Sequence, residues 1–151
     1  AHALSFLMPQ NSAIVAARGG VVQRVAAHQG NMEGEEFFRV IEIFHRDGTT
    51  ARYWHLGQFG TRVSPGDVVY RGQLIGSTGT TGISRSQVLR FEVGRKAPKL
   101  RRWYQFRDPW WNPYSEFETI PVRFADVAEP DGGPREGRWY RSRNVSVPTV
   151  Y

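Results

Sequence analysis

Residues 75–93 have the sequence IGSTGTTGISRSQVLRFEV. A turn bounded by glycines at residues 79–82 precedes a predicted strand at residues 88–93. Side chains on a strand alternate between its two faces. One face is apolar and therefore predicts core packing: Leu89, Phe91 and Val93. The other face carries Val88, Arg90 and Glu92, and these side chains are expected to point away from the core.

This stretch resembles the C-terminal signature of the lysostaphin/LytM-type metallopeptidases, the M23 family, in which a Gly-Asn-Thr-Gly turn leads into His-Leu-His-Phe-Glu. The frame and the hydrophobic positions match, but Val88 and Arg90 stand where the family has its two histidines. The resemblance implies an all-β fold, an antiparallel LytM/M23-like sheet of the duplicated hybrid or barrel-sandwich type. It also implies a peptidase scaffold built around a site that has lost its metal ligands.

A second motif occupies residues 43–56, IFHRDGTTARYWHL, and resembles the family pattern I-x-H-x-D-G-x-x-T-x-Y-x-H-L. Its Asp-Gly pair predicts a hairpin turn between two strands. In the family the second histidine of this pattern lines the catalytic groove. The resemblance thus implies a groove position for His55 and a structural role for His45. Strand alternation predicts that Tyr53 faces the same side as His55.

The first residues resemble the His-x-x-x-Asp segment of the family with both ligands replaced. Aligned on residues 6–9, FLMP, the chain has Ser5 at the aspartate position and Ala1 at the histidine position. His2 lies one residue away and would point to the opposite face, so we expect it to have no role. A catalytic zinc needs three protein ligands and an open position, which the mapped residues do not supply. We therefore predict no bound metal and no other cofactor.

Two further turn signals predict hairpins, at Gly19–Gly20 and at Pro65–Gly66. The second lies within residues 63–76, VSPGDVVYRGQLIG, which match the family pattern V-x-x-G-D-x-V-x-x-G-Q-x-I-G. Biotinyl and lipoyl carrier domains share nearly the same pattern, but they require a lysine at a hairpin tip. No lysine precedes Lys96 in this chain, so a carrier role is disfavoured.

Composition narrows the class of protein further. With 151 residues, 40% of them hydrophobic, the chain is expected to form one globular domain. It has no cysteine, which excludes disulfides, cysteine nucleophiles and cysteine zinc sites. The net charge of +6 comes from scattered arginines, which we interpret as a solvated surface, and no nucleic-acid partner is expected. No run of eighteen apolar residues occurs, so no transmembrane segment is predicted.

Residues 94–151 follow the family-like core, which we place at residues 1–93, and we expect this β-rich extension to pack on the same domain. Basic and aromatic residues are interleaved in residues 94–112. Such mixtures occur at partner interfaces, and packing of the same rings on the sheet is equally consistent. The candidates for partner contact are Trp103, Trp110 and Trp111. A strand is predicted at residues 119–127, and one or two short strands at residues 138–151.

Together these observations predict a catalytically inactive pseudopeptidase of the bacterial envelope, periplasmic or extracellular. By resemblance to relatives with the same losses, it would activate a cell-wall hydrolase or act as a scaffold for envelope proteins. The predicted vestigial groove comprises Ser5, Tyr53, His55, Val88 and Arg90. We expect Arg90 and His55 to lie on its floor as binding residues, with Glu92 as the carboxylate beside Arg90. Two alternatives remain, a zinc metalloendopeptidase that cleaves peptidoglycan peptides and a module that binds peptidoglycan glycan.

Overall fold

The structure is a computed structural model that describes residues 2–28, 38–79, 88–96, 117–125, 127, 129 and 132–140. Within these ranges every regular element is a strand, and every strand pair is antiparallel. The strands are β1 (Leu4–Leu7), β2 (Ala13–Val15), β3 (Gly20–His28), β4 (Phe38–Phe44), β5 (Thr50–Thr61), β6 (Val68–Val69), β7 (Leu74–Thr78), β8 (Val88–Lys96) and β9 (Phe117–Ile120). The all-β antiparallel prediction is confirmed. No helix suited to crossing a membrane occurs in the described segments.

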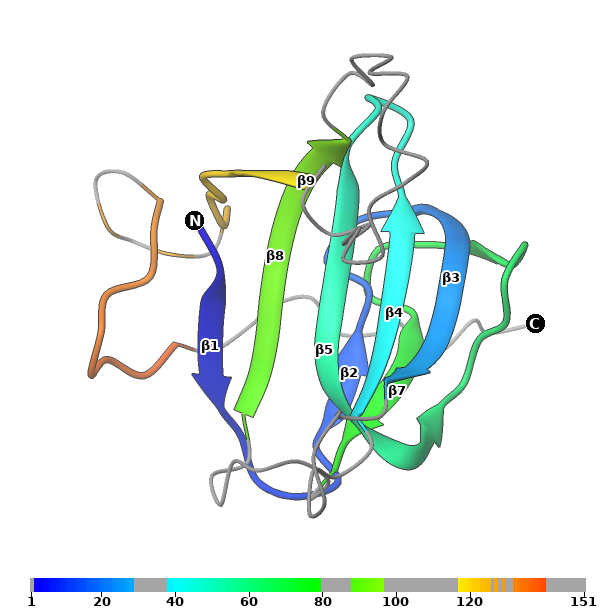
Figure 1. The fold of residues 1–151 in the computed structure, drawn as a ribbon. Coiled ribbons are helices and arrows are strands. Elements are labelled where there is room, and N and C mark those ends of the chain that lie inside the picture. Colours follow the sequence, from blue (N-terminus) through cyan, green and yellow to red (C-terminus); the bar gives the residue numbers. More distant parts are fainter. Residues whose placement is uncertain are drawn as a thin grey trace, which may run out of the picture.

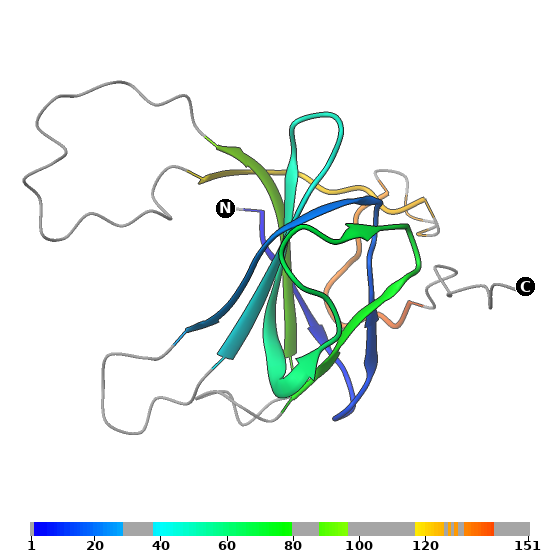
Figure 2. The same ribbon diagram turned by 90° about the vertical axis from the view of Figure 1, so that its right-hand side faces the viewer.

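The strands run in the order β1-β8-β5-β4-β3-β6, with β7 joined to β2 and β5, and β9 joined to β8 (Figure 1). Strands β1 and β9 lie end to end along one edge of β8, because β1 pairs with its first residues and β9 with its last. Seen from the side, β2 and β7 lie across from the long central strands (Figure 2). The long β5 pairs with β4, β7 and β8, so it belongs to both parts of the fold.

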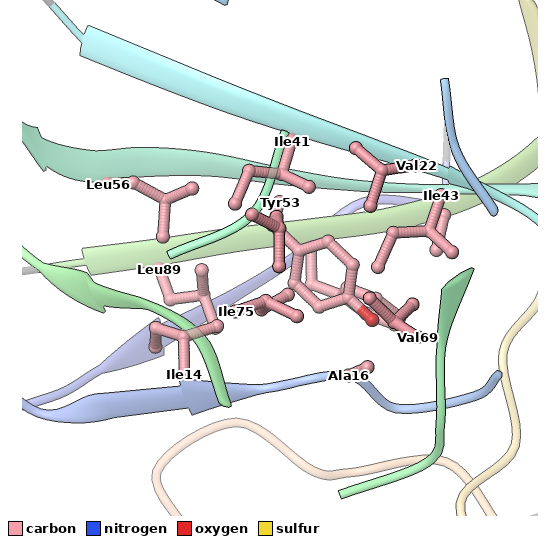
Figure 3. Packing of buried hydrophobic residues seen from close by; sticks show 13 residues of the cluster. Ile14, Ala16, Val22, Ile41, Ile43, Tyr53, Leu56, Val69, Ile75 and Leu89 are labelled. Carbon is pink, nitrogen blue, oxygen red and sulfur yellow. The ribbon is translucent and has the colours of Figure 1, made fainter. Parts of the chain in front are cut away.

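The hydrophobic core fills the space between the central strands and the β2–β7 pair. Figure 3 shows side chains of β4 and β5 pointing toward those of β2 and β7. The largest fully buried side chains of the core are Val22, Ile41, Ile43, Tyr53, Leu56, Val69 and Ile75. Burying each such aliphatic side chain contributes about 1.5–3 kcal/mol relative to leaving it in water. The predicted core face of β8 is confirmed, since Leu89 and Phe91 are buried and Val93 packs against them.

The predicted turns have mixed outcomes. The Asp47–Gly48 turn joins β4 and β5 as a hairpin, with Gly48 at a φ of 83° that favours glycine. The Gly19–Gly20 hairpin is wrong, because β2 pairs with β7 whereas β3 pairs with β4 and β6. A Cβ on Gly20 would lie 2.2 Å from the Phe44 carbonyl oxygen, so glycine there permits close strand approach instead of a reversal. Pro65–Gly66 does form a turn, but it leads to β6, which pairs with β3 and makes no hairpin with β5.

The C-terminal extension, residues 94–151, contributes one short strand and a following segment that packs against the core. Strand β9 begins at Phe117 and ends at Ile120, so the predicted strand at residues 119–127 is wrong beyond that point. Pro121 follows directly and has no N–H to continue the ladder. Further along, the Phe124 ring meets Phe6 edge-on at 6.1 Å between ring centroids and tilts against Phe91. Trp103, Trp110 and Trp111 lie outside the described residues, as do residues 141–151.

Candidate functional site

Two neighbouring strands place side by side two of the positions at which the M23 family has metal ligands. Ser5 on β1 is the cross-strand partner of Arg90 on β8, and Trp54 on β5 is its partner on the other side. Directly paired residues point to the same side of a sheet. The same side also carries the pair of Val88 and Leu7. Ser5 is exposed and the Arg90 side chain is 48% exposed, so this row of residues opens to solvent.

His55 is brought next to Arg90 by an irregularity in β5. Arg39 pairs with Leu56 and Val40 pairs with Trp54, which leaves His55 as the extra residue of a β-bulge. Its φ of 67° is unusual for a residue other than glycine. Burial lowers the pKa of His55 below 6.5, and the positive charge of Arg90 lowers it further. His55 is therefore neutral at pH 7, and because its folded pKa is depressed, stability falls as the pH drops below 6.5.

Tyr53 does not line this site, so the prediction that it faces the same side as His55 is wrong. It pairs with Phe91 and lies in the core at 2% exposure, with its hydroxyl accepting a hydrogen bond from the Ala17 N–H at 2.9 Å. Burial raises the pKa of Tyr53 to about 12. The bulge explains the error, because it interrupts the alternation on which the prediction relied. His45, in contrast, is buried, with Nδ1 2.8 Å from the Gly19 carbonyl oxygen.

Glu92 lies on the same side and is the centre of a buried ion network. Its Oε2 lies 3.6 Å from Arg90 Nη2, as the strand alternation of β8 leads one to expect. Its Oε1 accepts a hydrogen bond from Trp54 Nε1 at 3.1 Å and lies 3.6 Å from Arg52 Nη1. Arg52 Nε lies 3.0 Å from Glu42 Oε1 in turn. Glu92 thus contacts Arg52, Trp54 and Arg90.

Two further residues of this network were not predicted from the sequence. Glu42 and Arg52 are each 7% exposed, and their register places Glu42, Arg52 and Glu92 side by side across three strands. The signal was a charged residue within each strand, Glu42 in FRVIEIF and Arg52 in TARYWHL. The Phe117 ring of β9 covers the network, with the Arg52 guanidinium carbon 3.5 Å from its centroid.

Comparison with known proteins identifies the scaffold. The family model described as Peptidase family M23 matches residues 1–101. The chain belongs to this family. An NMR structure of lysostaphin is similar to this M23 domain, with 27% identity, a TM-score of 0.52, and coverage of 66% of this chain and 38% of that one. The match thus spans well under half of the lysostaphin chain. A search of curated proteins found no match.

Catalytic domains give similar results. A mutant catalytic domain of the prophage-encoded M23 protein EnpA from Enterococcus faecalis shares 25% identity at a TM-score of 0.52, covering 65% of this chain and 70% of that one. The catalytic domain of the antimicrobial peptidase lysostaphin from Staphylococcus simulans shares 29% identity at a TM-score of 0.50, covering 62% and 65%. These likenesses support the expected LytM/lysostaphin-like fold.

The residues at the family's metal positions do not fit a zinc ion. Ser5 is a poor zinc ligand and the Arg90 guanidinium stays protonated. Val88, at the position of the second catalytic histidine, has no donor atom. The remaining mapped position, Ala1, lies outside the described residues. Among the residues that the structure describes, no group of three or more His, Cys, Asp or Glu side chains is placed to hold a metal. The two ligand positions that the structure describes offer the hydroxyl of Ser5 and the cation of Arg90. The neutral imidazole of His55 lies next to Arg90.

Proposed function

We propose that this M23 domain is non-catalytic and acts as a protein-interaction or regulatory module in the bacterial envelope. The observation that carries the proposal is the direct pairing of Arg90 with Ser5 at two positions where the family places metal ligands. A divalent ion 4 Å from a guanidinium would meet repulsion on the order of several kcal/mol even at an effective dielectric of 20. Without a metal-activated water, His55 alone does not supply a route to amide hydrolysis.

The proposed domain extends beyond the family-like core of residues 1–93. Strand β9 pairs with β8, and Val122 and Phe124 pack against the core cluster. These contacts support including residues 94–151 in the same unit.

The envelope setting and the partner class follow from the family. Lysostaphin, a similar structure, is an antimicrobial peptidase, and the M23 scaffold is one that acts on bacterial cell walls. A domain that keeps this scaffold but offers a cation at the metal position is suited to binding near the cell wall, not to cutting it. We propose a periplasmic or extracellular location, with a cell-wall hydrolase or another envelope protein as the partner.

Affinity capture tests this function. Immobilised wild-type protein is incubated with a bacterial envelope extract, and bound proteins are identified by mass spectrometry. We expect a cell-wall hydrolase or envelope scaffold protein to be enriched over a column carrying Arg90→Glu, while Arg95→Glu, an exposed arginine on the opposite face of β8, captures as wild type. A Trp110→Ala column reports separately on the aromatic segment.

Three results would contradict the proposal or part of it. Release of peptides from purified peptidoglycan by this protein alone would establish an endopeptidase. Retention on purified peptidoglycan with no protein enriched would establish a cell-wall-binding module. Wild-type capture by Arg90→Glu combined with loss by Trp110→Ala would move the interface from the groove to the aromatic segment.

A further inference from the structure

The charges on this side of the sheet form an ordered row. Arg24 pairs with Glu42, Glu42 with Arg52, and Arg52 with Glu92, across strands β3, β4, β5 and β8. The signs alternate, so the two arginines and two glutamates sum to zero. Glu42, Arg52 and Glu92 are at most 7% exposed. Since buried charges need compensation, this row satisfies its own electrostatic requirement.

Arg90 stands in the next row, and its side chain is 48% exposed. The one carboxylate near it in the described part of the chain is Glu92, and their separation of 3.6 Å is longer than a hydrogen bond. Glu92 is already shared with Arg52 and with the Trp54 indole. The exposed part of the Arg90 side chain is therefore open to a ligand.

We propose that Arg90 is the receptor for a peptide carboxylate, held beside Ser5 at the position that the family gives to a metal ligand. The inference rests on the proposed non-catalytic function. A guanidinium presents up to five N–H donors in a planar fork that matches the two oxygens of a carboxylate. Glu92 lies 3.6 Å from Arg90 Nη2, and the Arg90 side chain is 48% exposed, so part of the fork is open to a ligand.

The neighbouring row defines the ligand further. Leu7 and Val88 pair directly, and Leu7 is 69% exposed. Residues two apart on a strand lie about 6.6 Å apart on the same face. When a peptide binds Arg90 through its carboxylate, the side chain one or two residues before that carboxylate therefore lies over Leu7 and Val88. This side chain should be apolar. Such a carboxylate comes either from the end of a peptide chain or from an acidic side chain within one.

The test uses three capped peptides and isothermal titration calorimetry. Acetyl-Ala-Leu-Ala with a free carboxylate should bind wild-type protein with a dissociation constant of about 1 mM. Its C-terminal amide should bind about ten- to hundredfold more weakly, since a charge-assisted hydrogen-bond pair is lost. Acetyl-Ala-Leu-Asp-Ala amide carries its carboxylate on a side chain. Tighter binding of the first peptide assigns the site to chain ends, and tighter binding of the third assigns it to acidic side chains.

Variants separate a specific receptor from general charge attraction. Arg90→Gln should lose the same ten- to hundredfold in affinity, and Arg90→Lys should lose part of it, because lysine keeps the charge without the fork. Arg95→Gln removes an exposed arginine from the opposite face of the same strand and should bind as wild type. Circular dichroism on each variant verifies folding. Equal losses in Arg90→Gln and Arg95→Gln would show nonspecific attraction and overturn the proposal.

A second readout follows the site itself. In an NMR titration the pKa of His55 should rise when the carboxylate peptide is bound, because the ligand offsets the repulsion from Arg90, and it should stay unchanged with the amide. Equal affinity of the acid and both amides would overturn the carboxylate receptor. The proposed function could still be supported in that case by capture of an envelope protein. Hydrolysis of peptidoglycan would overturn the proposed function, whatever the peptide affinities are.

Discussion

Replacing Glu92 by alanine should lower the free energy of unfolding by about 3 kcal/mol or more, the cost of removing one partner from a buried ion pair. The substitution removes the ion pair between Glu92 and Arg52 and the acceptor of the Trp54 Nε1 hydrogen bond. Urea denaturation followed by tryptophan fluorescence measures the change. Arg90 should also lose its ion pair with Glu92.

The matched control is Glu118→Ala on β9, where the side chain is exposed. An exposed charge of this kind should change stability by no more than about 0.5 kcal/mol. Glu92→Gln keeps the shape of the side chain and tests whether charge or hydrogen bonding dominates. A cost below about 1 kcal/mol for Glu92→Ala, comparable to the control, would mean that the network does not stabilise the fold.

A second large effect is expected at Gly94, where β8 meets β9. A Cβ at this position would lie 2.3 Å from the Glu118 carbonyl oxygen and 2.6 Å from the Phe117 ring. Because the first atom belongs to the backbone, Gly94→Ala has to displace β9 and lift Phe117 off the Arg52 guanidinium. We expect a destabilisation of about 3 kcal/mol, at the upper end for overpacking.

Hydrogen exchange locates that effect. The amides of β9 should exchange much faster in Gly94→Ala than in wild type, while those of β4 change little. Gly66→Ala is the control, since nothing lies within 4 Å of a Cβ there and its φ of 96° leaves only backbone strain, about 1–2 kcal/mol. Unchanged exchange in β9 would show that it does not pack on Gly94 as described.

Much of the fold could be predicted because local chemistry and tertiary structure agree there. On β8 the apolar residues alternate with polar ones, so Leu89 and Phe91 identified the core face. Asp47–Gly48 specified a hairpin, because glycine tolerates the positive φ that this turn requires. The M23 spacing placed Ser5 and Arg90 close together, and their direct pairing follows from β1 lying along β8.

The failures have a common physical cause, which is that a local signal does not specify its partner. The sequence around Gly20 predicts a turn, but in the structure this glycine allows the backbone of β4 to approach closely. The bulge at His55 shifts the alternation by one residue, which no periodic pattern reveals. A charged residue within a strand does not reveal its partner, and only the register across β4, β5 and β8 brings Glu42, Arg52 and Glu92 together.

Metal analysis tests the central claim most directly. Protein purified without chelator is examined for zinc by mass spectrometry, and its melting temperature is measured with and without added zinc. With Arg90 and Ser5 at the ligand positions, we predict no stoichiometric zinc and no rise in melting temperature, since only a ligand of the native state stabilises it. One tightly held zinc per chain, whose removal lowers the melting temperature, would contradict the account of a metal site replaced by a cation.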